Sequence, residues 1–137
     1  MKNFKLPLIA LIIYSLFSFK NVPIEESEKI VGVWFTENNS SKIQIYKADN
    51  QYFGKIIWLA SKSEKEDLKT KLTLGYQIFR KFTNESKNLC SGGQVSDPRS
   101  GMTVSGKMTL KDNQTLNVRG YLGTPMFGKT VILKRAE

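Results

Sequence analysis

Arg119 and Tyr121 are the residues whose types and spacing best fit the binding of a small molecule. Apolar and polar residues alternate from Thr115 to Leu122, so these two share one face of an expected β-strand. A guanidinium can donate two parallel hydrogen bonds to a carboxylate or a phosphate, and a phenol can donate another. If this face points into a cavity, the pair is a candidate ligand-binding site. If it faces solvent or belongs to an internal polar network, the pair is structural.

Residue types that commonly carry out catalysis or bind metals are scarce. The sequence contains no His, which excludes His-based triads, His general bases and His-ligated metals. The single Cys excludes an internal disulfide framework and a multi-Cys zinc site, and we expect Cys90 to be a small buried apolar residue. Three aspartates, Asp49, Asp97 and Asp112, lie in turn sequences, and three acidic residues lie in the charged segment 61–73. No pair has a spacing that would hold two carboxylates over one bond. We therefore expect no enzyme, no cofactor and no metal.

The N-terminus has the composition of an export signal. Lys2 and Lys5 precede an uncharged and largely apolar run at residues 6–19. A membrane-spanning helix needs about 20 apolar residues, so this run is too short to span and fits the hydrophobic region of a signal peptide. A buried core helix or an uncleaved anchor are the alternatives. We expect a signal helix at residues 1–20, a single domain at residues 21–137, and a periplasmic or extracellular protein.

The charge balance bears on the partners of an exported protein. The chain has 21 Lys and Arg against 12 Asp and Glu, a formal net charge of +9. Residues 1–20 contain three lysines and no acidic residue, so their removal leaves +6. Outside the cytoplasm this charge favours anionic surfaces such as lipid headgroups or acidic glycans over nucleic acid, unless it only keeps the surface soluble. We expect a monomer that does not insert stably into the membrane after the signal is removed.

The rest of the chain is organised as short strands separated by turn sequences. Residues 61–73 interrupt this pattern as a long loop or a short exposed helix. Regular strand spacing predicts an antiparallel sandwich or barrel, and eight strands suffice for a closed barrel with room for side chains or one small ligand. The expected strands are 30–36, 42–48, 52–60, 75–83, 89–95, 103–110, 115–122 and 127–135.

Gly32, Trp34 and Arg135 are the candidates for closing such a barrel. Gly32 and Trp34 lie on the first expected strand, where a glycine lets another backbone approach closely. Arg135 ends the last strand, on the same face as Val131 and Leu133. We expect the guanidinium to lie across the Trp34 ring as a cation–π contact at one end of the barrel. An early Gly-x-Trp with a late Arg resembles the pattern of the lipocalin-like superfamily.

A closer resemblance covers most of the chain after residue 20. Its four segments look like those of the exported bacterial family labelled domain of unknown function 2147. The resemblance implies an exported, lipocalin-like eight-stranded antiparallel β-barrel and implies no established activity. The segments are Gly32-Val33-Trp34, the run from Tyr52 to Leu59, the run from Gly92 to Pro98 with Gly101, and the run from Leu116 to Gly123 followed by Phe127–Thr130 and Arg135.

This chain departs from the family pattern at three places. Ser96 occupies a position where the family usually has an aromatic residue, and Leu133 occupies one where Trp is common. Residues 61–74 lack the usual Asp-x-x-Asn-Pro run. Any site that depends on those residues is in doubt for this chain.

These features favour an exported protein that binds a small apolar or amphipathic molecule, lipophilic or anionic, inside the barrel. The competing class is a protein-interaction or structural module of the cell envelope, with the 61–74 loop and the lysine-rich exterior as its contact surface. A membrane-embedded eight-stranded barrel is a third class. Its strands would be longer and its lysines less evenly spread than in this sequence.

Overall fold

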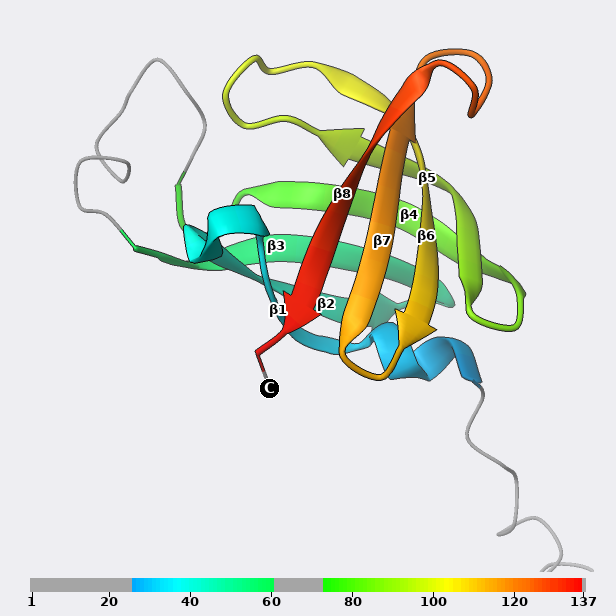
Figure 1. The fold of residues 1–137 in the computed structure, drawn as a ribbon, viewed down its shortest axis with the longest axis horizontal. Coiled ribbons are helices and arrows are strands. Elements are labelled where there is room, and N and C mark those ends of the chain that lie inside the picture. Colours follow the sequence, from blue (N-terminus) through cyan, green and yellow to red (C-terminus); the bar gives the residue numbers. More distant parts are fainter. Residues whose placement is uncertain (1–25, 61–72, 137) are drawn as a thin grey trace, which may run out of the picture.

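The computed structural model describes residues 26–60 and 73–136 (Figure 1). The predicted signal helix at residues 1–20 and nearly all of the charged segment at residues 61–73 lie outside the described residues. In the part that is described, no helix is long and apolar enough to cross a lipid bilayer.

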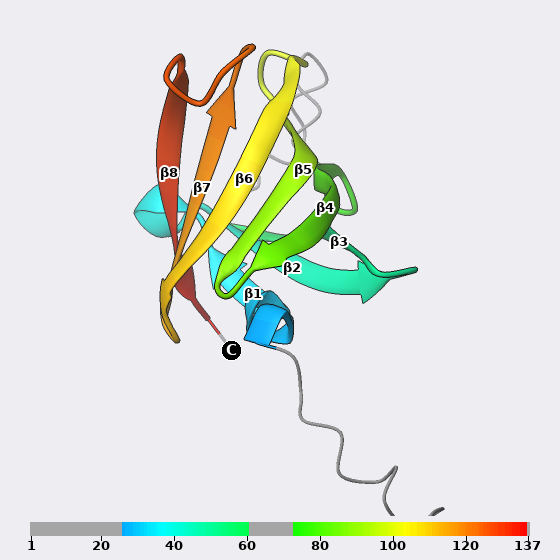
Figure 2. The same ribbon diagram turned by 90° about the vertical axis from the view of Figure 1, so that its right-hand side faces the viewer.

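Eight antiparallel strands form a closed barrel, which confirms the predicted all-β architecture (Figures 1 and 2). Each strand pairs with its neighbour in the sequence, and β1 also pairs with β8 to complete the ring. Two 3-10 helices, η2 (Glu26–Ile30) and η3 (Glu37–Asn39), flank the first strand. The strands are β1 (Gly32–Phe35), β2 (Ser41–Ala48), β3 (Gln51–Leu59), β4 (Gln77–Ser86), β5 (Leu89–Ser96), β6 (Thr103–Asp112), β7 (Thr115–Tyr121) and β8 (Gly128–Arg135).

Alternation of apolar and polar residues places one face of each strand inside the barrel. In β2, Ile43 and Ile45 are buried, whereas Gln44 between them is exposed. Burying such side chains stabilises the fold by about 1.5–3 kcal/mol each. The buried residues form one main cluster in the interior: Ile30, Trp34, Ile43, Ile45, Tyr52, Phe79, Phe82, Cys90, Met108, Leu110, Leu116, Val118 and Leu133.

Trp34 and Arg135 meet where the first and last strands pair. They are direct partners in the β1–β8 register, and the guanidinium carbon lies 4.2 Å from the centre of the indole ring. The indole Nε1 donates a hydrogen bond to the carbonyl of Ile30 at 2.9 Å, which ties η2 to this end of the barrel. Gly32 has a φ of 145°, a conformation open almost only to glycine, so backbone geometry accounts for this residue.

Arg135 also hydrogen-bonds the chain segments around this end. Its Nε donates to the carbonyl of Asn113 at 2.6 Å, and its terminal nitrogens donate to the carbonyls of Val31 and Lys29. One side chain therefore joins β8, the β6–β7 turn and the segment that enters β1. We call this end of the barrel, with η2, Trp34 and Arg135, the sealed end.

A bulge in β4 places two large side chains inside the barrel. Phe79 and Phe82 are three positions apart, so a regular strand would put them on opposite faces. Lys81 has a φ of 60°, and the β3–β4 register shifts here, which returns Phe82 to the interior. The two phenyl rings then meet edge to face, with centroids 6.2 Å apart. The bulge thus supplies much of the aromatic core.

Glycines on the inner face make room for these rings. A Cβ at Gly93 would overlap the Phe82 ring, and a Cβ at Gly54 would come within 2.6 Å of the Phe79 ring. Gly106 has the same role beside Val95 and Phe82. The absence of a side chain at these positions lets the rings lie flat against the barrel wall, as close packing requires.

Candidate functional site

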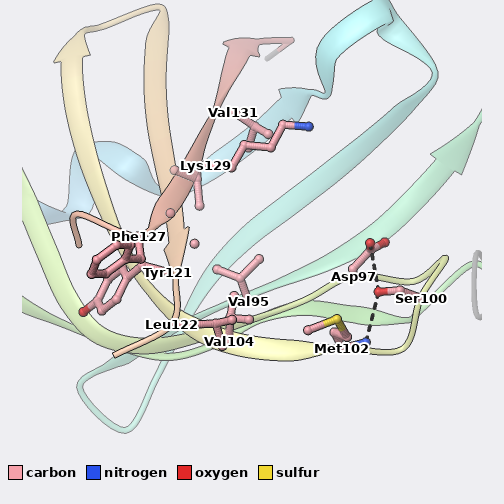
Figure 3. A pocket seen from close by; sticks show the side chains of 13 residues that line it. Val95, Asp97, Ser100, Met102, Val104, Tyr121, Leu122, Phe127, Lys129 and Val131 are labelled. Atoms are coloured by element: carbon pink, nitrogen blue, oxygen red, sulfur yellow. Dashed lines mark hydrogen bonds between the residues drawn. The ribbon is translucent and has the colours of Figure 1, made fainter. Parts of the chain in front are cut away.

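A large cavity lies at the end of the barrel opposite Trp34, which we call the open end. It has a volume of about 640 Å³ and lies between the β5–β6 and β7–β8 turns (Figure 3). Its lining is mostly apolar. The lining residues are Val95, Asp97, Ser100, Met102, Val104, Val118, Gly120, Tyr121, Leu122, Phe127, Gly128, Lys129 and Val131.

Small residues on the inner faces of β5 to β8 leave this space unfilled. Val95 and Val104 are register partners in β5 and β6, and Val118 and Val131 are register partners in β7 and β8. Gly120 follows on the inner face of β7 and has no side chain. Valine and glycine occupy these inner positions, whereas the much larger Trp34 fills the barrel at the sealed end. The cavity therefore follows directly from residue size.

Lys129 is the only Lys or Arg side chain among the described residues that lines this cavity. By the strand period of two it shares the inner face of β8 with Val131 and Leu133. Its register partner is Gly120, which offers no side chain to compete for the space. Within the described ranges the Lys129 amine has neither a hydrogen bond nor an ion pair. The mouth of an apolar cavity thus carries a cation that has no counter-ion among the described residues.

The β5–β6 turn forms the opposite rim and is fixed by its own hydrogen bonds. The Asp97 carboxylate accepts hydrogen bonds from the Arg99 backbone N–H at 2.9 Å and from the Ser100 hydroxyl at 3.0 Å. The Ser100 oxygen accepts one from the Met102 N–H at 3.2 Å (Figure 3). Gly101 completes the turn with a φ of 76°. The predicted tight turn is present, and the Asp97 carboxylate is used to hold it.

A second cavity of about 400 Å³ adjoins the first at the open end. The two share Val95, Asp97 and Val131 as lining residues. The second cavity has a more polar rim, where the hydroxyls of Thr36 and Ser41 hydrogen-bond each other at 3.0 Å. A ligand in the larger cavity would therefore have polar groups within reach across the shared wall.

Arg119 and Tyr121 are not brought together in a cavity. The buried face of β7 carries Leu116 and Val118, so Arg119 lies on the outer face. Its guanidinium donates to the Pro125 carbonyl at 2.6 Å and to the Thr130 hydroxyl at 2.9 Å, holding the β7–β8 turn. Arg119 lines neither cavity, whereas Tyr121 lines the edge of the larger one. The geometry gives Arg119 a structural role.

Lys129 was not among the residues singled out from the sequence. The signal was present, because the period that places Val131, Leu133 and Arg135 on one face of the last strand also places Lys129 there. Lys129 is a candidate site residue because no side chain on the neighbouring strand fills the space beside it. That information comes from the register with Gly120 on β7.

Cys90 and the acidic residues are further described side chains that could act as a nucleophile or bind a metal ion. Burial raises the pKa of the Cys90 thiol to about 11, so the thiol is neutral near pH 7. Within residues 26–60 and 73–136, three or more His, Cys, Asp or Glu side chains are nowhere grouped to hold a metal ion. The candidate site is accordingly a cavity that would bind by shape, apolar contact and one positive charge.

Comparison with solved structures supports the barrel architecture. Protein HP1028 from the human pathogen Helicobacter pylori, which belongs to the lipocalin family, superposes with a TM-score of 0.63 at 17% identity. The match covers 78% of this chain and 82% of that one. A redesigned β-barrel superposes with a TM-score of 0.50 at 17% identity, covering 82% of this chain and 96% of the design. At these identities the likeness establishes the fold alone.

Sequence comparison identifies the family. No curated protein matches the chain significantly. A family of bacterial proteins matches over residues 32–135, from the first residue of β1 to the last of β8. The chain therefore belongs to the family described as uncharacterized protein conserved in bacteria, DUF2147.

Proposed function

We propose that the protein is an exported carrier or sensor that binds a small amphipathic molecule with a negatively charged group at the open end of the barrel. The observation that carries the proposal is the 640 Å³ cavity with Lys129 at its mouth, in a barrel whose other end is filled. Export is supported by the basic and then apolar composition of residues 1–20. The similar H. pylori structure supports the barrel fold in which such a cavity lies.

The apolar part of the ligand would lie against the four valines. The cavity volume is within the range of about 300–1,000 Å³ that is usual for small-molecule sites. Each methylene group transferred from water to such a wall contributes about 0.8 kcal/mol. A chain or ring system of several carbons would therefore obtain most of its affinity from Val95, Val104, Val118 and Val131.

The charged part of the ligand would lie at the mouth beside Lys129. An ammonium without a protein partner favours a carboxylate, sulfonate or phosphate over a neutral group. Because the amine is exposed to solvent, we expect the ion pair to contribute about 1 kcal/mol or less. Lys129 would then determine the orientation and class of ligand, while the valines provide the affinity.

Titration with 1-anilinonaphthalene-8-sulfonate, an apolar anion, tests the proposal by fluorescence. Val104→Phe fills the cavity and should weaken binding at least tenfold, and Ile132→Phe on the outer face of β8 is the matched control. Lys129→Gln should weaken binding up to about fivefold, less so at high salt. Thermal unfolding verifies that each variant is folded. Equal binding by the wild type and Val104→Phe would contradict the proposal.

A further inference from the structure

Four large apolar side chains are exposed around the mouth of the larger cavity. The exposed fraction is 60% for Leu122, 84% for Met126 and 73% for Phe127 in the β7–β8 turn, and 55% for Met102 in the facing β5–β6 turn. Figure 3 shows Phe127 and Met102 on opposite sides of the cavity. A soluble protein rarely exposes so many large apolar groups together unless they contact something.

Hydrogen bonds within the β7–β8 turn fix the conformation in which these side chains are exposed. The Leu122 N–H donates to the Phe127 carbonyl at 3.1 Å, and the Phe127 N–H donates to the Thr124 carbonyl at 3.1 Å. Arg119 holds the same turn from outside the barrel through the Pro125 carbonyl. The apolar side chains are therefore presented by a turn with a defined conformation.

The charge next to these apolar groups is positive. Across residues 97–104 and 119–131 the charged side chains are Arg99, Arg119 and Lys129 against Asp97 alone, a net charge of +2. The Asp97 carboxylate is held in its own turn by two hydrogen bonds. Exposed apolar side chains flanked by basic residues match the chemistry of an anionic lipid surface, where the apolar groups enter the acyl boundary and the cations meet the headgroups.

We infer that the open end of the barrel docks on an anionic lipid bilayer through Met102, Leu122, Met126 and Phe127. The inference rests on the exposed side chains and their charges, and it does not require that the cavity hold a ligand. Docking in this orientation would bring the cavity mouth against the lipid, so an amphipathic molecule would pass between bilayer and barrel without crossing water. Each buried large side chain and each nearby Lys or Arg would strengthen binding.

An environment-sensitive fluorophore on the full chain tests the orientation directly. The variant Met126→Cys carries a nitrobenzoxadiazole label, and buried Cys90 remains unlabelled in the folded protein. Lys111→Cys, exposed at the sealed end, carries the same label as the control. With vesicles of phosphatidylglycerol and phosphatidylcholine, we expect a blue shift at position 126 and none at position 111. The shift should diminish with salt and with vesicles of phosphatidylcholine alone.

Substitution of the apolar residues tests the contact itself. Phe127→Ser should reduce vesicle binding severalfold, whereas Trp58→Ser, at an exposed position on the outer wall, should leave it unchanged. Met126→Ser changes an exposed turn residue that does not line the cavity, so it should also weaken vesicle binding while leaving anilinonaphthalene sulfonate binding without vesicles unchanged. No shift at position 126, or a shift at position 111 alone, would overturn the inference. So would a dimer that forms without lipid and is disrupted by Phe127→Ser.

Discussion

The two ends of this barrel are built from the same eight strands and differ in what fills them. At the sealed end, Trp34 is completely buried and lies beneath Arg135, with η2 beside it. At the open end, valines and Gly120 occupy the corresponding inner positions, and a cavity of about 640 Å³ results. Closure of the ring therefore does not determine whether a barrel is hollow. Residue size at a few inner positions does.

Because of this difference, the residues that stabilise the fold are concentrated at the sealed end, and the residues of the proposed binding site are at the open end. The close packing around Trp34 and the hydrogen bonds of Arg135 are concentrated at the sealed end. The open end has exposed apolar groups and Lys129, which has no partner among the described residues; these features do little for the stability of the folded chain. We expect substitutions at the two ends to have different consequences.

The largest effect should come from Trp34. Trp34→Ala removes the largest fully buried side chain among the described residues, its hydrogen bond to the Ile30 carbonyl and the ring that lies against Arg135. It should therefore lower the free energy of unfolding by about 3–5 kcal/mol. Val104→Ala at the open end should cost about 1 kcal/mol because its side chain already borders empty space. Urea unfolding measures both. Equal losses would show that the ends are not distinct.

Substituting alanine for inner glycines should also show the difference between the two ends, with losses of stability smaller than that of Trp34→Ala. Gly93→Ala forces a methyl group into the Phe82 ring and should cost about 1–3 kcal/mol. Gly120→Ala meets only a Val104 methyl at 3.0 Å, which can move toward the cavity, so its cost should be under about 1 kcal/mol. Thermal melts compare the two variants. Adding Phe82→Leu should recover part of the loss in Gly93→Ala and none in Gly120→Ala.

The effect that is smallest near neutral pH concerns Cys90, because it appears only at alkaline pH. Because the folded thiol has its pKa raised to about 11 from 9.0, the unfolded chain releases this proton first as pH rises. The stability that the neutral thiol provides is complete below pH 9 and decreases between about pH 9 and 11. The free energy of unfolding, measured across this pH range, should decrease less steeply in Cys90→Ala than in the wild type. Parallel declines would mean that the thiol is not protected by burial.

Much of the fold could be predicted because local and long-range signals agree. Turn sequences such as Asp49-Asn50 and Asp97-Pro98 separate alternating strands, and both positions do form turns. The pairing of Trp34 with Arg135 followed from the face that Arg135 shares with Leu133. These inferences need only a period of two and the chemistry of one contact.

The site was harder to predict because it depends on how several strands pack together, which the sequence of one strand does not determine. Lys81 adopts a positive φ although it is not a glycine, and this bulge changes which of its neighbours face inward. The alternation in β7 gave two faces without saying which is inside. Tertiary packing placed Arg119 outside, where it holds a turn, and left Lys129 at the cavity. The volume of the cavity likewise depends on side chains from several strands, so it cannot be predicted from one strand alone.

The attachment of Arg135 to the start of the domain has a consequence for synthesis. Its guanidinium reaches the carbonyl of Lys29, 106 positions earlier in the chain. Contacts between such distant positions form late, since the intervening polymer must first be brought together. A nascent chain can thus assemble hairpins while translation continues, but the barrel keeps unpaired strand edges until β8 has left the ribosome. Prolonged pausing before β8 emerges would leave the protein at its most vulnerable to aggregation.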